Sequence, residues 1–339
     1  MTSMLAPAYT VRMGSQEWTE QIVQIRVSLG AAPAVDSASI VLPLTPTFKA
    51  KPGDEAVVTL DSGERSDTVF SGTIDRVRRT PSSIAVSMVN AGGIMARVRP
   101  AVTFEQVTAG RLVRELCTEA GVDAGAIQDG VSLPFYVADP ERTGWQHASR
   151  VAAWSGAVVT VSTENKVDAT VIDATQAEFA LRYGRELLDY AFDTSASYID
   201  TFTTAGESGV GDTADDKVLR TTADFFAGSR PSGPGKGSSW RSYPALRTAE
   251  AAASAAAARK RLYTSSRDIA QFTAFLLPHL RPGTVIEVQD LPDLPVAPYW
   301  IRRVQHAVSA EGALTRVHCA RGGDAFDPSS LLGSLGSLL

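Results

Sequence analysis

Cysteine is scarce in this chain of 339 residues, which contains only Cys117 and Cys319. Two thiols so far apart cannot define a disulfide framework, so the sequence gives no indication of a disulfide-stabilised fold. Unpaired cysteine usually behaves as a small apolar residue and is buried. We therefore expect both thiols to be free and buried.

The sequence also lacks a strong charge of either sign and any long apolar run. Its net charge is -5, whereas a general nucleic-acid binder needs a basic face. No apolar stretch approaches the roughly 20 residues that span a bilayer, and Met1–Ala6 lacks the pattern of a signal peptide. We therefore expect cytoplasmic synthesis, no membrane insertion and no nucleic-acid specificity.

Motifs that carry chemistry are incomplete in this chain. Gly-Lys-Gly-Ser at 235–238 suggests a phosphate-binding loop, but Arg230 stands where that loop requires glycine. Gly-Glu-Ser-Gly at 206–209 suggests a nucleophile elbow, but Val210 takes the place of its last glycine. The sequence therefore predicts neither nucleotide binding nor hydrolase chemistry at these places.

The four histidines do not form a recognisable site. They are His147, His279, His306 and His318. His306 and His318 fall in neighbouring predicted strands with Cys319 beside them. Successive strand residues point to opposite faces, so His318 and Cys319 would not converge on a metal. We expect the barrel histidines to be half-exposed, and we predict no metal, no cofactor and no catalytic residues.

A turn that occurs twice organises the chain. Each copy begins with a basic residue, a proline and a glycine, and the turn residues are Pro52, Gly53, Pro282 and Gly283. In each copy the third and fifth residues after the glycine are apolar. An aromatic residue later leads into Ile-x-Arg-Val, at 74–77 and at 301–304. Loops can change length while strands keep their register, so this order predicts two related β units.

The first β unit covers residues 1–98. Alternation of apolar and polar residues begins at Val23, Ile25 and Val27, which predicts a strand with one wet face. Further strand patterns occupy 38–42, 54–60, 68–78 and 84–89. Five or more short antiparallel strands of this kind predict a small barrel that is closed or nearly closed.

An α+β segment over 99–180 separates the two β units. An apolar stripe predicts a helix over 108–120 that ends at Gly121, and its members are Leu112, Val113, Leu116 and Cys117. A second helix is expected over 143–154, followed by strands at 158–161 and 167–172. The fold class is therefore mainly β with an α+β insertion.

The second β unit covers residues 181–322. It includes strand patterns at 187–192, 198–204 and 313–320, a predicted mobile loop over 212–244 and an alanine-rich helix over 247–264. The tail over 323–339 is apolar but rich in glycine, and such a tail usually docks on its own chain or on a partner. Its leucines are Leu331, Leu332, Leu335, Leu338 and Leu339.

Several motifs, taken in order, resemble a known family. They are Lys51-Pro52-Gly53-Asp54 with Phe70-x-Gly72-x-Ile74-x-x-Val77, a middle segment with Trp145, Ser149 and Gly156, and Leu280-Arg281-Pro282-Gly283 with Tyr299-x-Ile301-x-x-Val304-x-His306. Over about residues 8–322 this order is similar to the baseplate hub of contractile phage tails, the late control protein D-like proteins. Related hubs occur in extracellular contractile injection systems and in the first half of type VI secretion spike proteins.

The resemblance implies two tail-tube-like β-barrels per chain, a small α+β domain and a homotrimer. Three such chains would present six quasi-equivalent barrels, so a threefold object can meet a hexameric inner tube. The other implied partners are a separate spike protein, further baseplate components, and a tape-measure protein or cargo in the channel. The implied role is structural, without enzymatic activity, in a phage virion or a contractile injection particle.

Only 16 residues follow Gly323, so the resemblance implies that the spike is a separate chain, on which the tail leucines could dock. Two alternatives stay open. A tail-associated cell-wall hydrolase would need clustered carboxylates in a cleft, which the sequence does not offer. A non-hub two-barrel binding module would act as a monomer or dimer, so the mass of the purified chain separates it from a trimeric hub.

Overall fold

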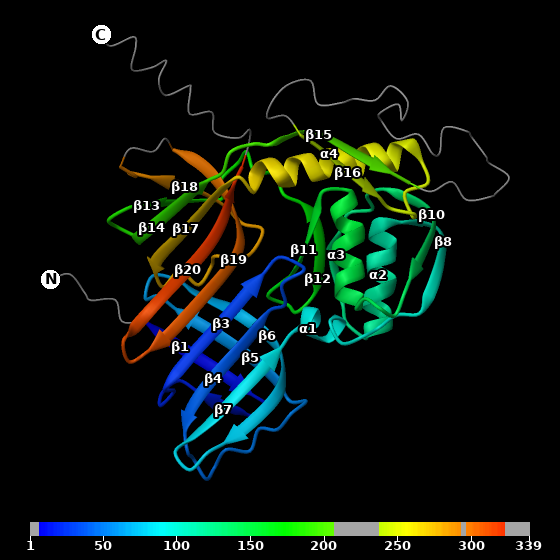
Figure 1. The fold of residues 1–339 in the computed structure, drawn as a ribbon. Helices are drawn as coiled ribbons and strands as arrows, with labels where there is room; N and C mark the ends of the chain where they lie inside the picture. The colour runs from blue at the N-terminus through cyan, green and yellow to red at the C-terminus, as the bar shows by residue number, and fades with distance from the viewer. Residues whose placement is uncertain (1–6, 207–236, 293–295, 323–339) are drawn as a thin grey trace, which may run out of the picture.

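The computed structural model describes residues 7–206, 237–292 and 296–322. Figure 1 shows two β-sheet modules that adjoin each other, with a group of helices and short strands beside them. The long helix α4 (Ala249–Ser265) crosses above that group. No helix within these ranges is long and apolar enough to cross a bilayer. The chain is mainly β, as predicted.

The first module is a five-stranded antiparallel sheet in the order β3-β4-β7-β6-β5. Its strands are β3 (Gln24–Gly30), β4 (Ser37–Pro43), β5 (Glu55–Asp61), β6 (Ser66–Arg79) and β7 (Ser83–Val89). Two more strands, β1 (Ala8–Met13) and β2 (Gln16–Trp18), extend the sheet beyond β5. The predicted alternation holds from Ile25 onward, but Val23 is 53% exposed because it precedes β3.

The second module repeats this order as β14-β17-β20-β19-β18. Its strands are β14 (Leu187–Thr194), β17 (Asp268–Phe275), β18 (Val285–Gln289), β19 (Ala297–Ser309) and β20 (Gly312–Arg321). One further strand, β13 (Phe179–Arg182), pairs in parallel with β18. The two β units predicted from the sequence are therefore two modules with the same strand order.

The two Pro-Gly turns make the same hydrogen bonds. The N–H of Gly53 donates to the carbonyl of Ile74, and the N–H of Gly283 donates to that of Ile301, each at 2.8 Å. In both turns the isoleucine N–H donates in return, at 2.8 Å, to the residue after the glycine. The angle φ is +94° at Gly53 and +95° at Gly283, a conformation that glycine adopts without strain.

A β-bulge follows each turn at the same place. The register between β6 and β7 shifts between Ile74 and Arg76, and the register between β19 and β20 shifts between Ile301 and Arg303. From these fixed points each strand of the first module has a counterpart in the second. Matched pairs across the sheets are Ile74 and Ile301, Met88 and Cys319, Ala38 and Ala270, and Val27 and Phe192.

Neither module closes into a barrel by strand pairing within the described residues. The strands of the two modules instead belong to one 13-stranded sheet, because the second half of β19 pairs with β3 of the first module. Figure 1 shows that both halves of this sheet curve. The sequence predicted barrels that are closed or nearly closed, and the described residues of one chain form no closed barrel. Each module is an open sheet with a free edge.

The α+β part agrees with the sequence prediction. Helix α2 (Ala109–Ala120) begins after Thr108, whose hydroxyl accepts a hydrogen bond from the N–H of Arg111, and it ends at Gly121. Helix α3 (Gly144–Trp154) begins with a capping box formed by Thr143 and Gln146. The other elements here are α1 (Ala91–Met95), β8 (Val102–Thr108), β9 (Ala124–Ile127), β10 (Ser132–Ala138), β11 (Ala157–Val161) and β12 (Val167–Val171).

The buried residues form two large cores. One runs through both β modules, and the other fills the α+β part. Cys117 and Cys319 are free and buried, one in each core, as predicted. Ala251 and Ala255 of α4 belong to the second core. The helix predicted over 247–264 was included in the second β unit, but in the structure it packs on the α+β part.

Part of the predicted mobile loop is a strand. Residues 237–242 form β16 (Gly237–Ser242), which pairs in parallel with β15 (Ile199–Ala205). The expected loop over 212–244 is therefore too long at its C-terminal end, because backbone pairing with β15 orders a segment whose side chains show no strand pattern. Residues 207–236 lie outside the described part of the chain.

Replacing either turn glycine with alanine should lower the free energy of unfolding by a similar amount, about 1–2 kcal/mol, because a side chain is strained at positive φ. Neither site is crowded: a methyl group would meet nothing within 4 Å at Gly53, and only Ile172, at 4.0 Å, at Gly283. Chemical denaturation measures both losses. Asparagine variants, which tolerate positive φ better, are the control. Clearly unequal losses for the two alanine variants would contradict the equivalence of the turns.

Candidate functional site

The joint between the two modules is the candidate functional site, because the edge strand of one module pairs there with a strand of the other module. Strand β19 pairs with β18 only as far as Trp300. Beyond its bulge, β19 pairs with β3, from Arg303 opposite Gly30 to Ser309 opposite Gln24. On one side, β19 therefore pairs first with a strand of its own module and then with a strand of the other module.

This pairing buries the side chains that face the core of the joint. Ile25 and Val27 of β3 have no exposed surface and Leu29 is 4% exposed, while Val304 and His306 of β19 have none. Pairing with a second strand gives these side chains cross-strand neighbours, which supply part of the contacts that bury them. The joint is thus a fully packed interface.

A buried carboxylate fixes the end of β3. Asp36 accepts a hydrogen bond from the N–H of Gly30 at 2.7 Å and another from Nδ2 of Asn90 at 2.8 Å. Burial raises the pKa of Asp36 to about 6, because the charged carboxylate loses its hydration there. The two hydrogen bonds and the charge of Arg281 act in the opposite direction and only partly offset it.

The second Pro-Gly turn reaches across the joint. The guanidinium of Arg281, just before this turn, donates a hydrogen bond to the backbone carbonyl of Thr68 in β6. The guanidinium of Arg65 lies over the ring of Phe179, 5.7 Å from its centroid, and that ring also contacts His279. These contacts hold the hairpin between β5 and β6 against the second module.

His306 differs from the half-exposed barrel histidine that was expected, since it has no exposed surface. Its Nδ1 lies 3.0 Å from Oγ1 of Thr315 on the neighbouring strand β20. Burial, the largest cause, and the nearby charge of Arg281 together lower the pKa of His306 to about 3. The imidazole is therefore neutral near pH 7 and packs as part of the joint. His318 is half-buried.

The remaining buried histidine belongs to the α+β part. Nδ1 of His147 lies 2.6 Å from the hydroxyl of Tyr136, and its Nε2 lies 2.9 Å from the carbonyl of Asp139. Both ring nitrogens are therefore engaged by the protein itself. Across the described ranges, no three His, Cys, Asp or Glu side chains are grouped so that they could hold a metal ion.

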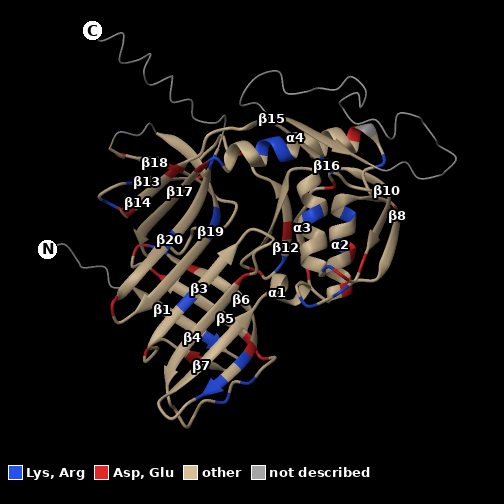
Figure 2. Ribbon diagram, viewed as in Figure 1, with Lys and Arg blue, Asp and Glu red and all other residues tan. Residues whose placement is uncertain are grey.

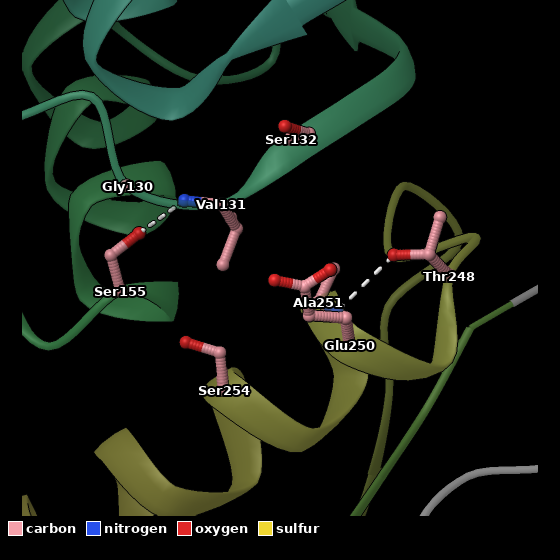
Figure 3. A pocket seen from close by; sticks show the side chains of 8 residues that line it. All are labelled: Gly130, Val131, Ser132, Ser155, Thr248, Glu250, Ala251 and Ser254. Atoms are coloured by element: carbon pink, nitrogen blue, oxygen red, sulfur yellow. Dashed lines mark hydrogen bonds between the residues drawn. The ribbon is translucent and has the colours of Figure 1, made fainter.

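A pocket of about 260 Å³ lies between the α+β part and the start of α4 (Figure 3). It is lined by Gly130, Val131, Ser132, Ser155, Thr248, Glu250, Ala251 and Ser254. Three lining hydroxyls serve the fold. Ser155 accepts from the N–H of Val131 at 2.9 Å, Thr248 accepts from that of Ala251 at 3.2 Å, and Ser254 donates to the carbonyl of Trp154 at 3.1 Å. Glu250 is the one carboxylate in the lining, whereas glycoside hydrolysis ordinarily uses a pair.

The predicted turn residues lie in contrasting surroundings. Pro52 and Gly53 are exposed, whereas Pro282 and Gly283 are half-buried. The tail leucines Leu331, Leu332, Leu335, Leu338 and Leu339 lie outside the described residues. Sequence reasoning did not single out Asp36. Only a strand-by-strand alignment of the two repeats could have placed it beside the joint.

The chain resembles known proteins in structure but not detectably in sequence. No protein-family model matches the sequence, and no curated protein matches it. The 43 kDa tail protein of prophage MuSo2 from Shewanella oneidensis matches in structure with a TM-score of 0.70 at 15% identity, covering 93% of this chain and 98% of that chain. A tail protein from Neisseria meningitidis MC58 matches with a TM-score of 0.72 at 13% identity, covering 93% and 96%.

A third similar structure comes from E. coli. The protein c3393, described as a component of the type VI secretion system with structural similarity to the T4 bacteriophage tail proteins gp27 and gp5, matches with a TM-score of 0.63 at 11% identity. The match covers 94% of this chain and 79% of that chain. The chain therefore has the fold of phage tail proteins over almost its whole length, as the order of motifs predicted. Likeness at such identities shows the fold and assigns no function by itself.

Two buried groups at the joint should respond to pH in opposite directions. The folded-state pKa of Asp36 lies above its ordinary value of 3.8, so its contribution to stability falls as the pH rises from about 4 through 6. The folded-state pKa of His306 lies below its ordinary value of 6.5, so its contribution falls as the pH decreases from about 6.5 towards 3.

Asp36→Asn should therefore make the loss of stability between about pH 7 and pH 4 steeper, and His306→Gln should make it shallower. Urea denaturation across this range measures the slope for each variant and for the wild type. The comparison of slopes is insensitive to a constant loss from altered packing. If both variants keep the wild-type slope, these groups do not titrate as their burial requires.

Proposed function

We propose that this chain is the structural baseplate hub of a contractile tail or injection system. Three chains would assemble into a ring that joins a hexameric inner tube to a trimeric spike, which is a separate protein. Further baseplate components would surround the ring, and a tape-measure protein or cargo would occupy its channel. The ring would be part of a phage virion or a contractile injection particle, and it would act without an active site.

One observation supports this proposal most strongly: the chain contains the same five-stranded module twice, joined edge to edge. A joint that fits two modules of one chain can also fit modules of neighbouring chains when their edges are alike. Three chains then present six near-equivalent modules around a threefold axis, which suits contact with a sixfold tube. The shared fold of the two tail proteins is consistent with this role.

Assembly also gives a reason for the open sheets. An uncovered sheet edge is a pairing site that proteins usually cover or use. In this proposal the two tube-like barrels expected from the sequence are completed by neighbouring chains, with residues 1–98 and 181–322 as the two tube-like domains. The small domain over 99–180 would lie beside them. The tail over 323–339 would dock on the spike.

The oligomeric state tests the hub directly. Full-length protein should have three times the chain mass of 35.9 kDa in light scattering coupled to size exclusion, because closed threefold symmetry is what the tube-to-spike junction needs. Native mass spectrometry provides an independent check. A chain that stays monomeric or dimeric, even when its spike is supplied, would contradict the hub and favour a simple binding module.

Alanine at Leu335, Leu338 and Leu339 should weaken spike binding, since each buried leucine contributes about 1.5–3 kcal/mol. Isothermal titration of the trimer with its spike measures the loss, and an unchanged melting temperature shows that the modules stay folded. Alanine at Leu262, which is exposed on α4, is a matched control. Unchanged affinity in the triple variant would remove the tail from the proposal and leave the hub intact.

A further inference from the structure

One edge of the second module has no strand partner within the described residues. In the described part of the chain, β14 from Asp189 to Thr194 pairs on one side only, with β17. We propose that this edge pairs antiparallel with the end of β6 in a second copy of the chain, and so repeats between chains the joint that β3 and β19 make within one. The inference rests on the proposed function, since it supplies the interface that closes the ring.

The internal repeat defines which residues would meet. Strand β14 corresponds to β3, and the end of β6 corresponds to the second half of β19, because turns and bulges match in both modules. Transfer of the β3–β19 register gives the opposed pairs Val77 and Thr194, Arg78 and Asp193, and Arg79 and Phe192. Pro81 then ends the pairing, since proline has no N–H to donate.

The matched strands β3 and β14 differ in burial: β14 is less buried, as expected for an edge that no strand covers. Ile25 and Val27 of β3 have no exposed surface beneath β19, whereas their counterparts Tyr190 and Phe192 on β14 are only half-buried. Leu188, close by on the same strand, is 43% exposed. An apolar strand edge of this kind gains contacts when another strand covers it. In the first module this strand surface is covered by β19. The corresponding surface of β14 in the second module is uncovered within the described residues.

The end of β6 likewise lacks burial and a strand partner on its outer edge within the described residues. Val304 and His306 have no exposed surface beside β3. Of their counterparts, Val77 is half-buried and Arg79 is exposed. Strand β5 follows β6 only as far as Thr73, so the outer edge beyond it carries no strand within the described residues. The two unfilled edges are therefore the two halves of one joint.

Charge favours pairing between these two edges. Arg76 and Arg78 are exposed at the end of β6, where Figure 2 shows basic positions at the lower end of the first module. Asp193 on β14 would lie opposite Arg78 and diagonal to Arg76, and none of the three forms an ion pair in the described part of the chain. The joint within the chain has Gln305 opposite Ser28 here, so charge distinguishes the two joints.

The first Pro-Gly turn is placed to support the same contact. At the internal joint, Arg281 beside the second turn binds the carbonyl of Thr68 in the other module. Its counterpart Lys51 is exposed beside the first turn. A neighbouring chain that docks on β6 would bring its second module next to this lysine.

Reversing either charge should weaken association about tenfold at each joint, because an attractive cross-strand pair becomes a repulsive one. Arg78→Asp and Asp193→Arg are made singly and together in the full chain, and sedimentation velocity measures the trimer fraction over a dilution series. The double variant should recover the wild-type trimer, since the pair is only exchanged. Arg316→Asp, an exposed position on the interior strand β20, should leave the trimer unchanged.

The outcomes separate this inference from the hub itself. A wild-type chain that remains a monomer even when its spike is supplied would overturn the proposed function and this interface with it. A wild-type trimer that both single variants retain would overturn only this interface. Loss in the single variants without recovery in the double variant would also overturn the assigned register.

Cysteine pairing provides a second measurement of the register. Val77→Cys with Thr194→Cys places two thiols directly opposite across the joint, where strand spacing allows a disulfide. Mild oxidation should convert the trimer into covalently linked chains on a non-reducing gel. Val77→Cys with Asp189→Cys is out of register and should not cross-link. Equal cross-linking in both variants, or none in the first, would contradict the pairing.

Discussion

Pairing between the edge of β3 and the second half of β19 is the interaction on which the rest of the structure depends. It turns two curved sheets into one 13-stranded sheet and gives both modules a single continuous core. The bulge between Ile301 and Arg303 marks the place where β19 passes from one sheet to the other. Without this pairing the apolar face of β3 would be left at an open edge, as that of β14 is.

The joint is specific because the hydrogen bonds of its charged groups form in one register only. Asp36 accepts from Gly30 and Asn90, and Arg281 reaches the backbone of Thr68. A slip by one residue would turn every core-facing side chain of β3 outward and break these bonds. Because the modules repeat, the same specificity can be used again between chains, where unfilled edges and opposite charges remain.

Local patterns predicted much of this fold. The matching turns at Gly53 and Gly283 predicted the repeat, and Thr108 and Thr143 stand at the starts of two predicted helices. The sequence could not show where open edges pair, because the β3–β19 contact joins segments at opposite ends of the chain. Nor could it place α4, since a helix composed mostly of alanine has no strong apolar stripe to indicate which part it covers. The burial of His306 and Asp36 follows from that long-range joint, so no local signal marks it.

The proposed hub requires that one chain supply two equivalent modules to a closed ring. End-on electron micrographs of the purified oligomer test this most directly, because they show the number of modules around the ring and its symmetry. We expect six similar lobes with threefold symmetry, two from each chain. A ring with any other number of lobes, or an open chain of modules that does not close, would contradict it.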